Sequence, residues 1–141
     1  MGIQNKKQRA RFSQLRQSLS RLGQEVSQLI KPFFSDQPVV RGSVYELKRK
    51  CGKPGCSCAR GQLHKRMVVS ASEKGRTRLT VIPRGFLVEV QRKVERYRRL
   101  RRSRARLIEV HKNMLKAMDE MEALRREEMT PPERSHGSGS L

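Results

Sequence analysis

The chain has no tryptophan, few aromatic residues and a modest share of apolar ones. Of its 141 residues, 4% are aromatic and 35% are hydrophobic, so the sequence predicts a single domain with a small core. No apolar run is long enough to span a membrane or to form the hydrophobic region of a signal peptide. We therefore expect a cytoplasmic protein with reduced thiols, whose helices each bury one stripe of side chains.

Acidic residues are too few to balance the basic ones. The 33 Lys and Arg residues face 13 Asp and Glu residues, which gives a net charge of +20. Residues 41–82 carry +9 and residues 83–106 carry +8, whereas residues 107–128 carry −2. A membrane surface is a poor partner, because no basic segment is paired with a strongly apolar, aromatic face. The charge indicates an anionic partner, with nucleic acid as the leading candidate.

The residue patterns of common enzymes are also missing. The sequence has no pair of carboxylates placed as acid and base, no Gly-rich phosphate loop and no Ser/His/Asp pattern. Glu46 and Glu73 are the acids nearest the cysteines, and a nuclease needs more carboxylates to hold its metal ions. We expect no enzymatic activity.

The three cysteines fall within eight residues, at Cys51, Cys56 and Cys58, and His64 follows them. Glycines and a proline between the first two cysteines allow sharp turns, and nearby lysines favour the thiolate form. Structural zinc takes four thiolate and imidazole ligands in a tetrahedron, which leaves no open position for catalysis. We therefore predict one Zn²⁺ bound by Cys51, Cys56, Cys58 and His64.

Other interpretations of this cluster stay open at the level of sequence. The thiols can be reduced without a metal, or two of them can form a disulfide that leaves one odd thiol. His111 and His136 are the alternatives to His64 as the fourth ligand.

Short motifs on both sides of the cysteines support the zinc-binding interpretation. Residues 51–61 read Cys-Gly-Lys-Pro-Gly-Cys-Ser-Cys-Ala-Arg-Gly, and Gly75-Arg76-Thr77, Val81-Ile82-Pro83 and Tyr97-Arg98-Arg99-Leu100 follow. Over about residues 41–105 these motifs resemble a small bacterial family of unknown function found near transposases and other mobile elements. Lys65-Arg66-Met67 departs from the Gly-Pro-aromatic pattern of that family. The resemblance implies a zinc-binding module and an accessory role for a mobile element, and it implies no activity.

Two segments have the apolar spacing of long amphipathic helices. Residues 4–30 carry an apolar side chain at every third or fourth position, namely Phe12, Leu15, Leu19, Leu22, Val26 and Leu29. Residues 83–128 carry a series from Leu87 to Tyr97 and a second one at Leu100, Leu107, Val110, Met114, Ala117, Met121 and Leu124. Pro83 suits the first turn of that helix. The two apolar faces predict a coiled-coil-like hairpin, and we also expect a homodimer because the second face is the longer one.

Between the helices, residues 40–50, 66–72 and 77–82 predict three antiparallel strands, with a turn at residues 73–76. The predicted fold class is α+β, a three-stranded zinc-clipped meander flanked by two long helices. Along the chain this gives a helix and linker at 1–38, the meander at 39–82, an Arg-rich helix at 83–128 and a disordered tail at 129–141. We expect Phe33 and Phe34 of the linker to fill the core rather than to stack on nucleic-acid bases.

Basic residues are concentrated in two groups. Residues 98–106 hold six arginines, Arg98, Arg99, Arg101, Arg102, Arg104 and Arg106, which repel each other unless anions lie nearby. The second group surrounds the cysteines and consists of Lys48, Arg49, Lys50, Lys53, Arg60, Lys65 and Arg66. Because arginine binds phosphate through its bidentate fork, we interpret both groups as nucleic-acid-binding residues. Aromatic and amide side chains near them are too few for base-specific readout.

These observations favour a basic, zinc-containing protein that binds DNA or RNA through phosphates and is not an enzyme. A protein of a different class also fits, namely an assembly adaptor whose coiled coil binds a protein partner and whose basic surface meets an acidic protein. Salt-dependent binding to generic duplex DNA distinguishes the two.

Overall fold

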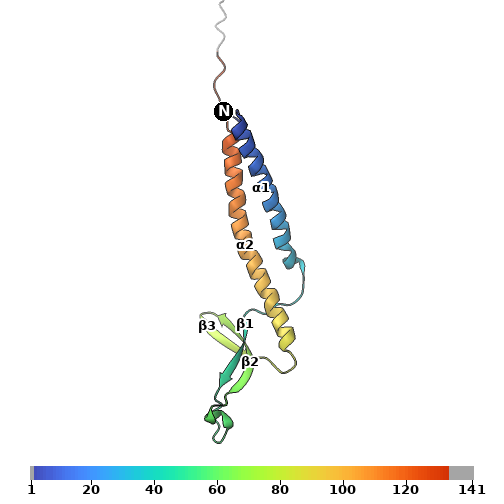
Figure 1. Ribbon diagram of the computed structural model, residues 1–141, viewed down its shortest axis with the longest axis vertical. Coiled ribbons are helices and arrows are strands. Elements are labelled where there is room, and N and C mark those ends of the chain that lie inside the picture. Colours follow the sequence, from blue (N-terminus) through green and yellow to red (C-terminus); the bar gives the residue numbers. More distant parts are fainter. Residues whose placement is uncertain (1, 134–141) are drawn as a thin grey trace, which may run out of the picture. The chain divides into compact units, whose positions relative to one another are not determined.

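The computed structural model describes residues 2–133, except for the side chains of Cys58 and Ala59. Its elements in chain order are α1 (Lys6–Ile30), the 3-10 turn η1 (Lys31–Phe34), β1 (Ser43–Arg49), the 3-10 turn η2 (Ser57–Arg60), β2 (His64–Glu73), β3 (Arg76–Val81) and α2 (Leu87–Arg125) (Figure 1). The predicted α+β class is therefore confirmed. Within the described residues, no helix is both long and apolar enough to cross a membrane.

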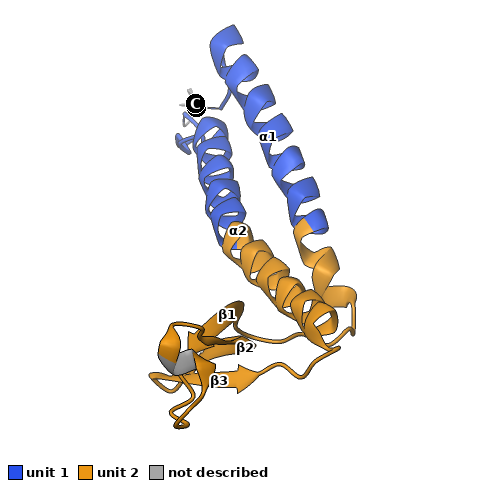
Figure 2. Cartoon of the chain, turned by 60° about the horizontal axis from the view of Figure 1, so that its bottom comes forward, with its two compact units in different colours: residues 1–28, 108–141 blue, residues 29–107 orange. Residues whose placement is uncertain are grey.

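The chain divides into two compact units (Figure 2). Unit 1 comprises residues 1–28 and 108–141, so it holds most of α1 and the last part of α2. Unit 2 comprises residues 29–107 and holds the sheet, the cysteine loop and the first part of α2. Most of the predicted tail, residues 134–141, lies outside the described residues, and residues 129–133 belong to no helix or strand.

Unit 1 is an antiparallel pair of helices. Leu15 of α1 and Val110 and Ala117 of α2 are buried, and the other predicted apolar positions of these two segments are at least half-buried. Arg11 donates two hydrogen bonds to the Glu120 carboxylate, from Nε at 2.7 Å and from Nη2 at 2.8 Å. This bond lowers the pKa of Glu120 and raises that of Arg11. Since both side chains are about half exposed, the pair adds little stability and mainly fixes the register of the helices.

Helix α1 begins one residue after an Asn cap. The Gln8 backbone N–H donates to Asn5 Oδ1 at 2.8 Å, and the Gln4 backbone N–H donates to Gln8 Oε1 at 2.9 Å. This reciprocal arrangement satisfies backbone donors that an uncapped helix would leave without partners. The structure thus places the start of the helix at Lys6, two residues after the predicted one.

The sheet of unit 2 has the strand order β1-β2-β3, with both neighbouring pairs antiparallel. Its centre is β2, in which Val68 is fully buried and Val69 is nearly so. Lys74 and Gly75 connect β2 to β3, and both have positive φ, as a two-residue hairpin turn requires. The three strands and this turn confirm the predicted meander, with strand ends that differ from the predicted ones by a few residues.

Helix α2 begins at Leu87 and not at the predicted Pro83. Gly85 has a φ of +88°, and the Phe86 backbone N–H donates to the Pro83 carbonyl at 3.2 Å. These residues form a tight turn whose third position needs glycine, and this turn delays the helix by four residues. The helix ends at Arg125, three residues before the predicted end.

The first part of α2 is hydrogen-bonded to the linker that leads into β1. The Val40 backbone N–H donates to the Lys93 carbonyl at 3.1 Å, and Arg96 Nη1 donates to the Pro38 carbonyl at 3.0 Å. Val94 of α2 and Ile82 after β3 are buried together with the centre of β2. The core of this unit is therefore small, as the composition indicated.

The prediction that Phe33 and Phe34 fill the core is wrong. Their side chains are 49% and 76% exposed. They lie in η1, where Pro32 follows the end of α1 and the chain turns away from the helix. Both residues lie between α1 and β1, and their rings face solvent.

We predict that Gly42→Ala destabilises unit 2. Gly42 has a φ of +140°, and a Cβ there would lie 2.5 Å from the Ser70 carbonyl oxygen. Gly75→Ala is the matched control, since its φ is +77° but no atom lies within 4 Å of the added carbon. We expect Gly42→Ala to cost about 1–3 kcal/mol more than Gly75→Ala, because only Gly42→Ala adds a steric overlap.

Urea denaturation followed by tyrosine fluorescence measures this difference. The chain has two tyrosines, Tyr45 and Tyr97, and both belong to unit 2. Equal stability of the two variants would contradict the close approach of Gly42 to β2.

Candidate metal centre

The cysteine loop joins β1 to β2. Arg49 at the end of β1 pairs with His64 at the start of β2, so the loop begins and ends at the same end of this strand pair. Gly52 and Gly55 have φ values of +73° and +81°, and the Cys56 backbone N–H donates to the Lys53 carbonyl at 3.3 Å. These glycines turn the backbone so that Cys51 and Cys56, five positions apart, present their sulfurs to one point.

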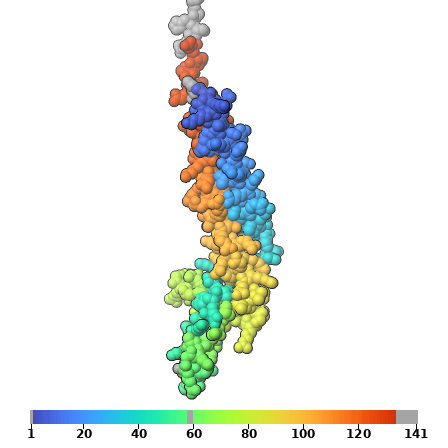
Figure 3. Space-filling model, in the orientation of Figure 1, coloured from blue at the N-terminus to red at the C-terminus, as the bar shows by residue number. Residues whose placement is uncertain are grey.

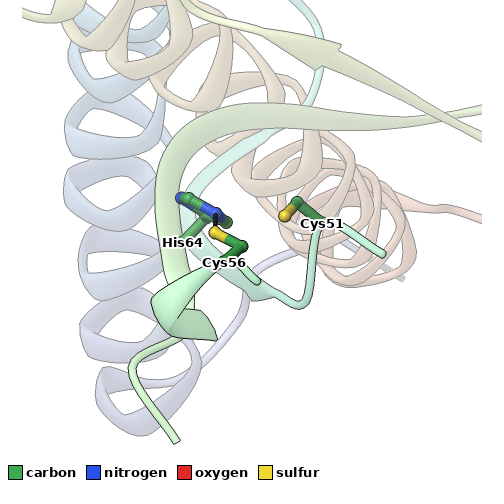
Figure 4. A group of neighbouring side chains, drawn as sticks. All are labelled: Cys51, Cys56 and His64. Carbon is green, nitrogen blue, oxygen red and sulfur yellow. Dashed lines mark hydrogen bonds between the residues drawn. The ribbon is translucent and has the colours of Figure 1, made fainter. Parts of the chain in front are cut away.

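Three predicted ligands come together at that point (Figure 4). The two Sγ atoms of Cys51 and Cys56 and a ring nitrogen of His64 all lie within 4.8 Å of one another. Cys56 Sγ and His64 Nε2 are 3.1 Å apart. Around a tetrahedral zinc ion, ligand atoms are separated by about 3.5–3.8 Å, given bonds of about 2.3 Å to sulfur and 2.0 Å to nitrogen. The three side chains are therefore close enough to bind a metal ion after small adjustments.

The fourth predicted ligand, Cys58, falls in η2, and its side chain lies outside the described residues. Of the alternative histidines, His136 also lies outside them, and His111 is a residue of α2 in unit 1 and not a member of the cluster. His64 is thus the histidine that the described part of the chain brings to the cysteines. Cys51 and Cys56 form no disulfide with each other.

The cluster borders a basic surface hollow of about 680 Å³ in unit 2. The hollow is lined by the three ligand residues and by Leu47, Arg49, Lys50, Lys53, Arg66 and Val81. Cys51 and His64 are exposed and Cys56 is half-buried, and the loop residues, green in the space-filling view, lie at the surface (Figure 3). The four cationic side chains favour thiolates over thiols, which is the form that binds a metal.

The other basic residues of the loop region lie on the same two strands and on η2. Lys48 of β1 and Lys65 of β2 are direct partners in the sheet register, and Arg60 ends η2. Like charges in directly opposite positions destabilise a sheet unless an anion offsets them. This pairing brings together two predicted phosphate-binding residues that are 17 positions apart in the sequence.

The arginines of α2 separate into groups. Arg98, Arg101 and Arg102 line a second hollow of unit 2, of about 620 Å³, which we call the arginine hollow. Its other lining residues are Arg41, Gly42, Ser43, Ser70, Ala71, Ser72 and Tyr97. Arg99 lines a smaller hollow with Arg96, while Arg104 and Arg106 are exposed on α2 and line neither of these two.

Arg41 is a member of the arginine hollow that the sequence analysis missed. Arg41 lies outside both basic groups of the sequence, and no sequence pattern except the neighbouring Gly42 indicated that it has a role. None of the described lining residues of this hollow is acidic. Arg102 donates a 2.8 Å hydrogen bond to Glu95, and this bond, with the charges of Arg98 and Arg99, lowers the pKa of that carboxyl.

The fold and the site together define an α+β protein with a Cys/His cluster suited to a metal ion and a strongly basic sheet unit. A model of a family described as a domain of unknown function, DUF6788, matches residues 12–92. The chain belongs to this family. The matched segment covers most of α1, the whole sheet and the cysteine loop, and it ends before the arginine run at 98–106. No curated protein and no solved structure matches the chain.

We predict that the reduced protein binds about one metal ion per chain through the cysteine loop. Cobalt(II) added to metal-free protein should produce absorption bands of sulfur-bound, tetrahedral metal, because two thiolates and an imidazole converge there. Cys56→Ser should abolish these bands, whereas His64→Ala should weaken binding. Ser57→Ala, which changes the same loop without touching a ligand atom, is the control.

Cys58→Ser completes this experiment. Loss of sulfur-to-cobalt absorption in that variant would identify Cys58 as a ligand, and an unchanged spectrum would remove it from the site. If wild-type protein takes up no cobalt under reducing conditions, the cluster is not a metal site.

Proposed function

We propose that this chain is a non-enzymatic, zinc-containing nucleic-acid-binding protein that holds phosphates on unit 2. The distribution of charge carries the proposal. Unit 2 has 22 Lys and Arg residues against five Asp and Glu residues, a net charge of +17, while unit 1 has 11 against eight, a net charge of +3. A surface with such an excess of one sign attracts a polyanion, and nucleic acid is a polyanion of high charge density.

The arginine hollow supports phosphate contacts in particular. It combines four guanidinium groups with hydroxyl groups of three serines, and both kinds of group donate hydrogen bonds to phosphate oxygens. Glu95 accepts a hydrogen bond from Arg102, and its single negative charge is small against the four guanidinium groups of the hollow. The remaining positive charge favours an anionic ligand.

The hollow at the cysteine loop supports a second contact region. It gathers Arg49, Lys50, Lys53 and Arg66 around the metal-binding cluster. The directly opposed Lys48 and Lys65 belong to the same end of the sheet. A phosphate backbone along this end would offset the repulsion between the strands, so binding and sheet stability would support each other.

Zinc is the metal that suits the donor set best. Thiolate and imidazole ligands in a tetrahedral arrangement favour zinc over the harder ions that prefer oxygen. A site closed by Cys58 as a fourth ligand would be structural and would fasten the ends of β1 and β2. Such a site requires reduced thiols, and we therefore propose a cytoplasmic location. An accessory role for a mobile element, as the sequence resemblance implies, is part of the same proposal.

We predict that the arginine hollow carries a measurable part of the binding energy. The triple variant Arg98→Gln, Arg101→Gln, Arg102→Gln keeps helix propensity and removes three charges. Its affinity for any sequence should be lower than that of wild type. The slope of log K against log salt concentration should become shallower by roughly one per lost phosphate contact, hence by up to about three.

The matched control removes three charges from α1 of unit 1, through Lys6→Gln, Lys7→Gln and Arg9→Gln. This variant should bind nearly as well as wild type, because the proposed contacts lie on unit 2. Fluorescence anisotropy with labelled oligonucleotides over a salt series gives both quantities. Equal loss in the two variants would mean that net charge alone acts, and absence of any binding at moderate salt would refute the proposal.

A second candidate function is the assembly adaptor, and one feature of unit 1 favours it. Ile108, Leu115 and Met118 of α2 are 43–46% exposed and stand seven and three residues apart, so they lie on one helix face. The buried positions Val110 and Ala117 lie on another face, against α1. An exposed apolar stripe of this kind suits a helix from a second chain, either another copy or a different protein.

We predict that this stripe, if it joins two copies, sets the oligomeric state. Leu115→Gln with Met118→Gln should convert a dimer to a monomer without loss of helix content, since both residues are exposed within unit 1. Met114→Gln, a half-buried position of the helix pair, should instead lower the stability of that pair. Light scattering at about 50 µM tests this, a concentration at which a coiled-coil face of this length associates. A monomeric wild-type protein would exclude the homodimer.

A further inference from the structure

Two adjacent phenylalanine rings are presented to solvent at the start of unit 2. Phe33 is 49% and Phe34 is 76% exposed. The chain has four phenylalanines, two tyrosines and no tryptophan, and these two adjacent rings are half of its phenylalanines. Exposing two neighbouring rings in a protein so poor in aromatics is costly, because each ring leaves a large apolar area in water.

The segment that carries these rings is held in place. It forms the 3-10 turn η1, in which Pro32 restricts the backbone. Pro32 and Ser35, on either side of the two rings, line a small hollow together with Arg96 and Arg99 of α2. Arg96 also donates its hydrogen bond to the Pro38 carbonyl, which fastens the linker to the helix. The residues that flank the two rings in the chain therefore share a hollow with two guanidinium groups, on a positioned segment.

Further exposed aromatic side chains belong to the same unit. Tyr45 is 40% and Phe86 is 52% exposed, and both lie within residues 29–107. By contrast, Phe12 of unit 1 is half-buried and lies under the Arg16 guanidinium, 5.6 Å from its ring centre. The exposed aromatics thus coincide with the unit that carries the net charge of +17.

Exposed aromatic rings on a strongly basic unit match a single strand better than a duplex. In a duplex each base face is covered by the neighbouring base pair, so only the edges of the bases are accessible to an aromatic side chain. In a single strand each base has a free face, and stacking on an aromatic side chain strengthens binding for any sequence. Arginines alongside hold the phosphates that connect the stacked bases.

We propose that unit 2 binds single-stranded nucleic acid, with bases stacked on Phe33 and Phe34 and phosphates held at Arg96 and Arg99. This inference rests on the proposed nucleic-acid-binding function and specifies its ligand. It also gives a role to the two rings that the sequence analysis assigned to the core.

The test compares a labelled single-stranded oligo-dT with a duplex of equal length, using full-length protein loaded with zinc. Wild type should bind the single strand more tightly. The double variant Phe33→Leu, Phe34→Leu keeps apolar side chains and removes the aromatic faces. It should lose roughly tenfold or more in single-strand affinity, because stacked bases are lost, and should bind the duplex as wild type does. The salt slope should stay unchanged, because no cation is removed.

Two controls make the result specific. Phe12→Leu removes a ring from unit 1 and should leave both affinities unchanged. Phe33→Tyr with Phe34→Tyr keeps two aromatic faces and should retain the single-strand affinity. Ultraviolet irradiation of the oligo-dT complex should also cross-link the peptide that contains Phe33 and Phe34, as mass spectrometry would show.

The possible outcomes separate this inference from the proposed function. Binding without a single-strand preference, or an unaffected Phe33→Leu, Phe34→Leu variant, overturns the inference and leaves the proposed function standing. Absence of binding to either oligonucleotide overturns both. If the leucine variant retains single-strand affinity but has a different oligomeric mass, the two rings form a protein contact and the inference is overturned.

Discussion

The small apolar core of unit 2 is the constraint on which the rest of its structure depends. Val68 and Val69 in the centre of β2 are buried, as are Ile82 and Val94, whereas the first three residues of β2 are exposed. Toward the cysteine loop, Lys48 faces Lys65 and Arg49 faces His64 across the strand pair. Short strands with like charges opposite each other do not hold together by their own packing. The cluster of Cys51, Cys56 and His64 stands at this end, where a bound metal ion would join the ends of β1 and β2.

The same constraint explains where the glycines of special conformation lie. Gly42 allows the chain to pass against the Ser70 carbonyl as it enters β1, and Gly52 and Gly55 direct Cys51 and Cys56 toward one point. Because unit 2 buries few apolar side chains, the close backbone approach at Gly42 and the tight turns of the cysteine loop have a larger share in defining its structure. The hydrogen bonds from the linker to α2 have a similar role, because they join the sheet to a helix without enlarging the core.

Positive charge and exposed apolar helix surface lie in different parts of the chain. Unit 2 carries nearly all of the net positive charge and the metal-binding cluster, whereas unit 1 is close to neutral and consists of a helix pair with an exposed apolar stripe. This division supports the proposals that unit 2 binds a polyanion and that the exposed stripe of unit 1 binds a helix of a second chain. The family match, which ends at residue 92, covers the sheet and the cysteine loop but not the arginine run.

Much of this organisation was predictable from local sequence patterns. The apolar periodicity predicted the helices and strands, because a helix or strand that buries one face must repeat its apolar residues at a fixed spacing. The clustering of Cys51, Cys56 and His64 in the sequence predicted that their side chains come together, since sharp Gly and Pro turns bring nearby residues close. The helix start at Leu87 was missed, because Pro83 alone suits a first helical turn and the positive φ of Gly85 was not apparent.

The amino-acid sequence by itself determined the class of the fold, the close grouping of the Cys and His residues and the strong positive charge of the chain. These properties follow from spacing and composition, which act over a few residues or over the whole chain. The tertiary structure alone decided that Arg41 joins Arg98, Arg101 and Arg102 in one hollow, that Lys48 faces Lys65, and that Phe33 and Phe34 stay exposed. Each of these results depends on which distant segments meet, and that depends on turns and strand register that side-chain patterns do not encode.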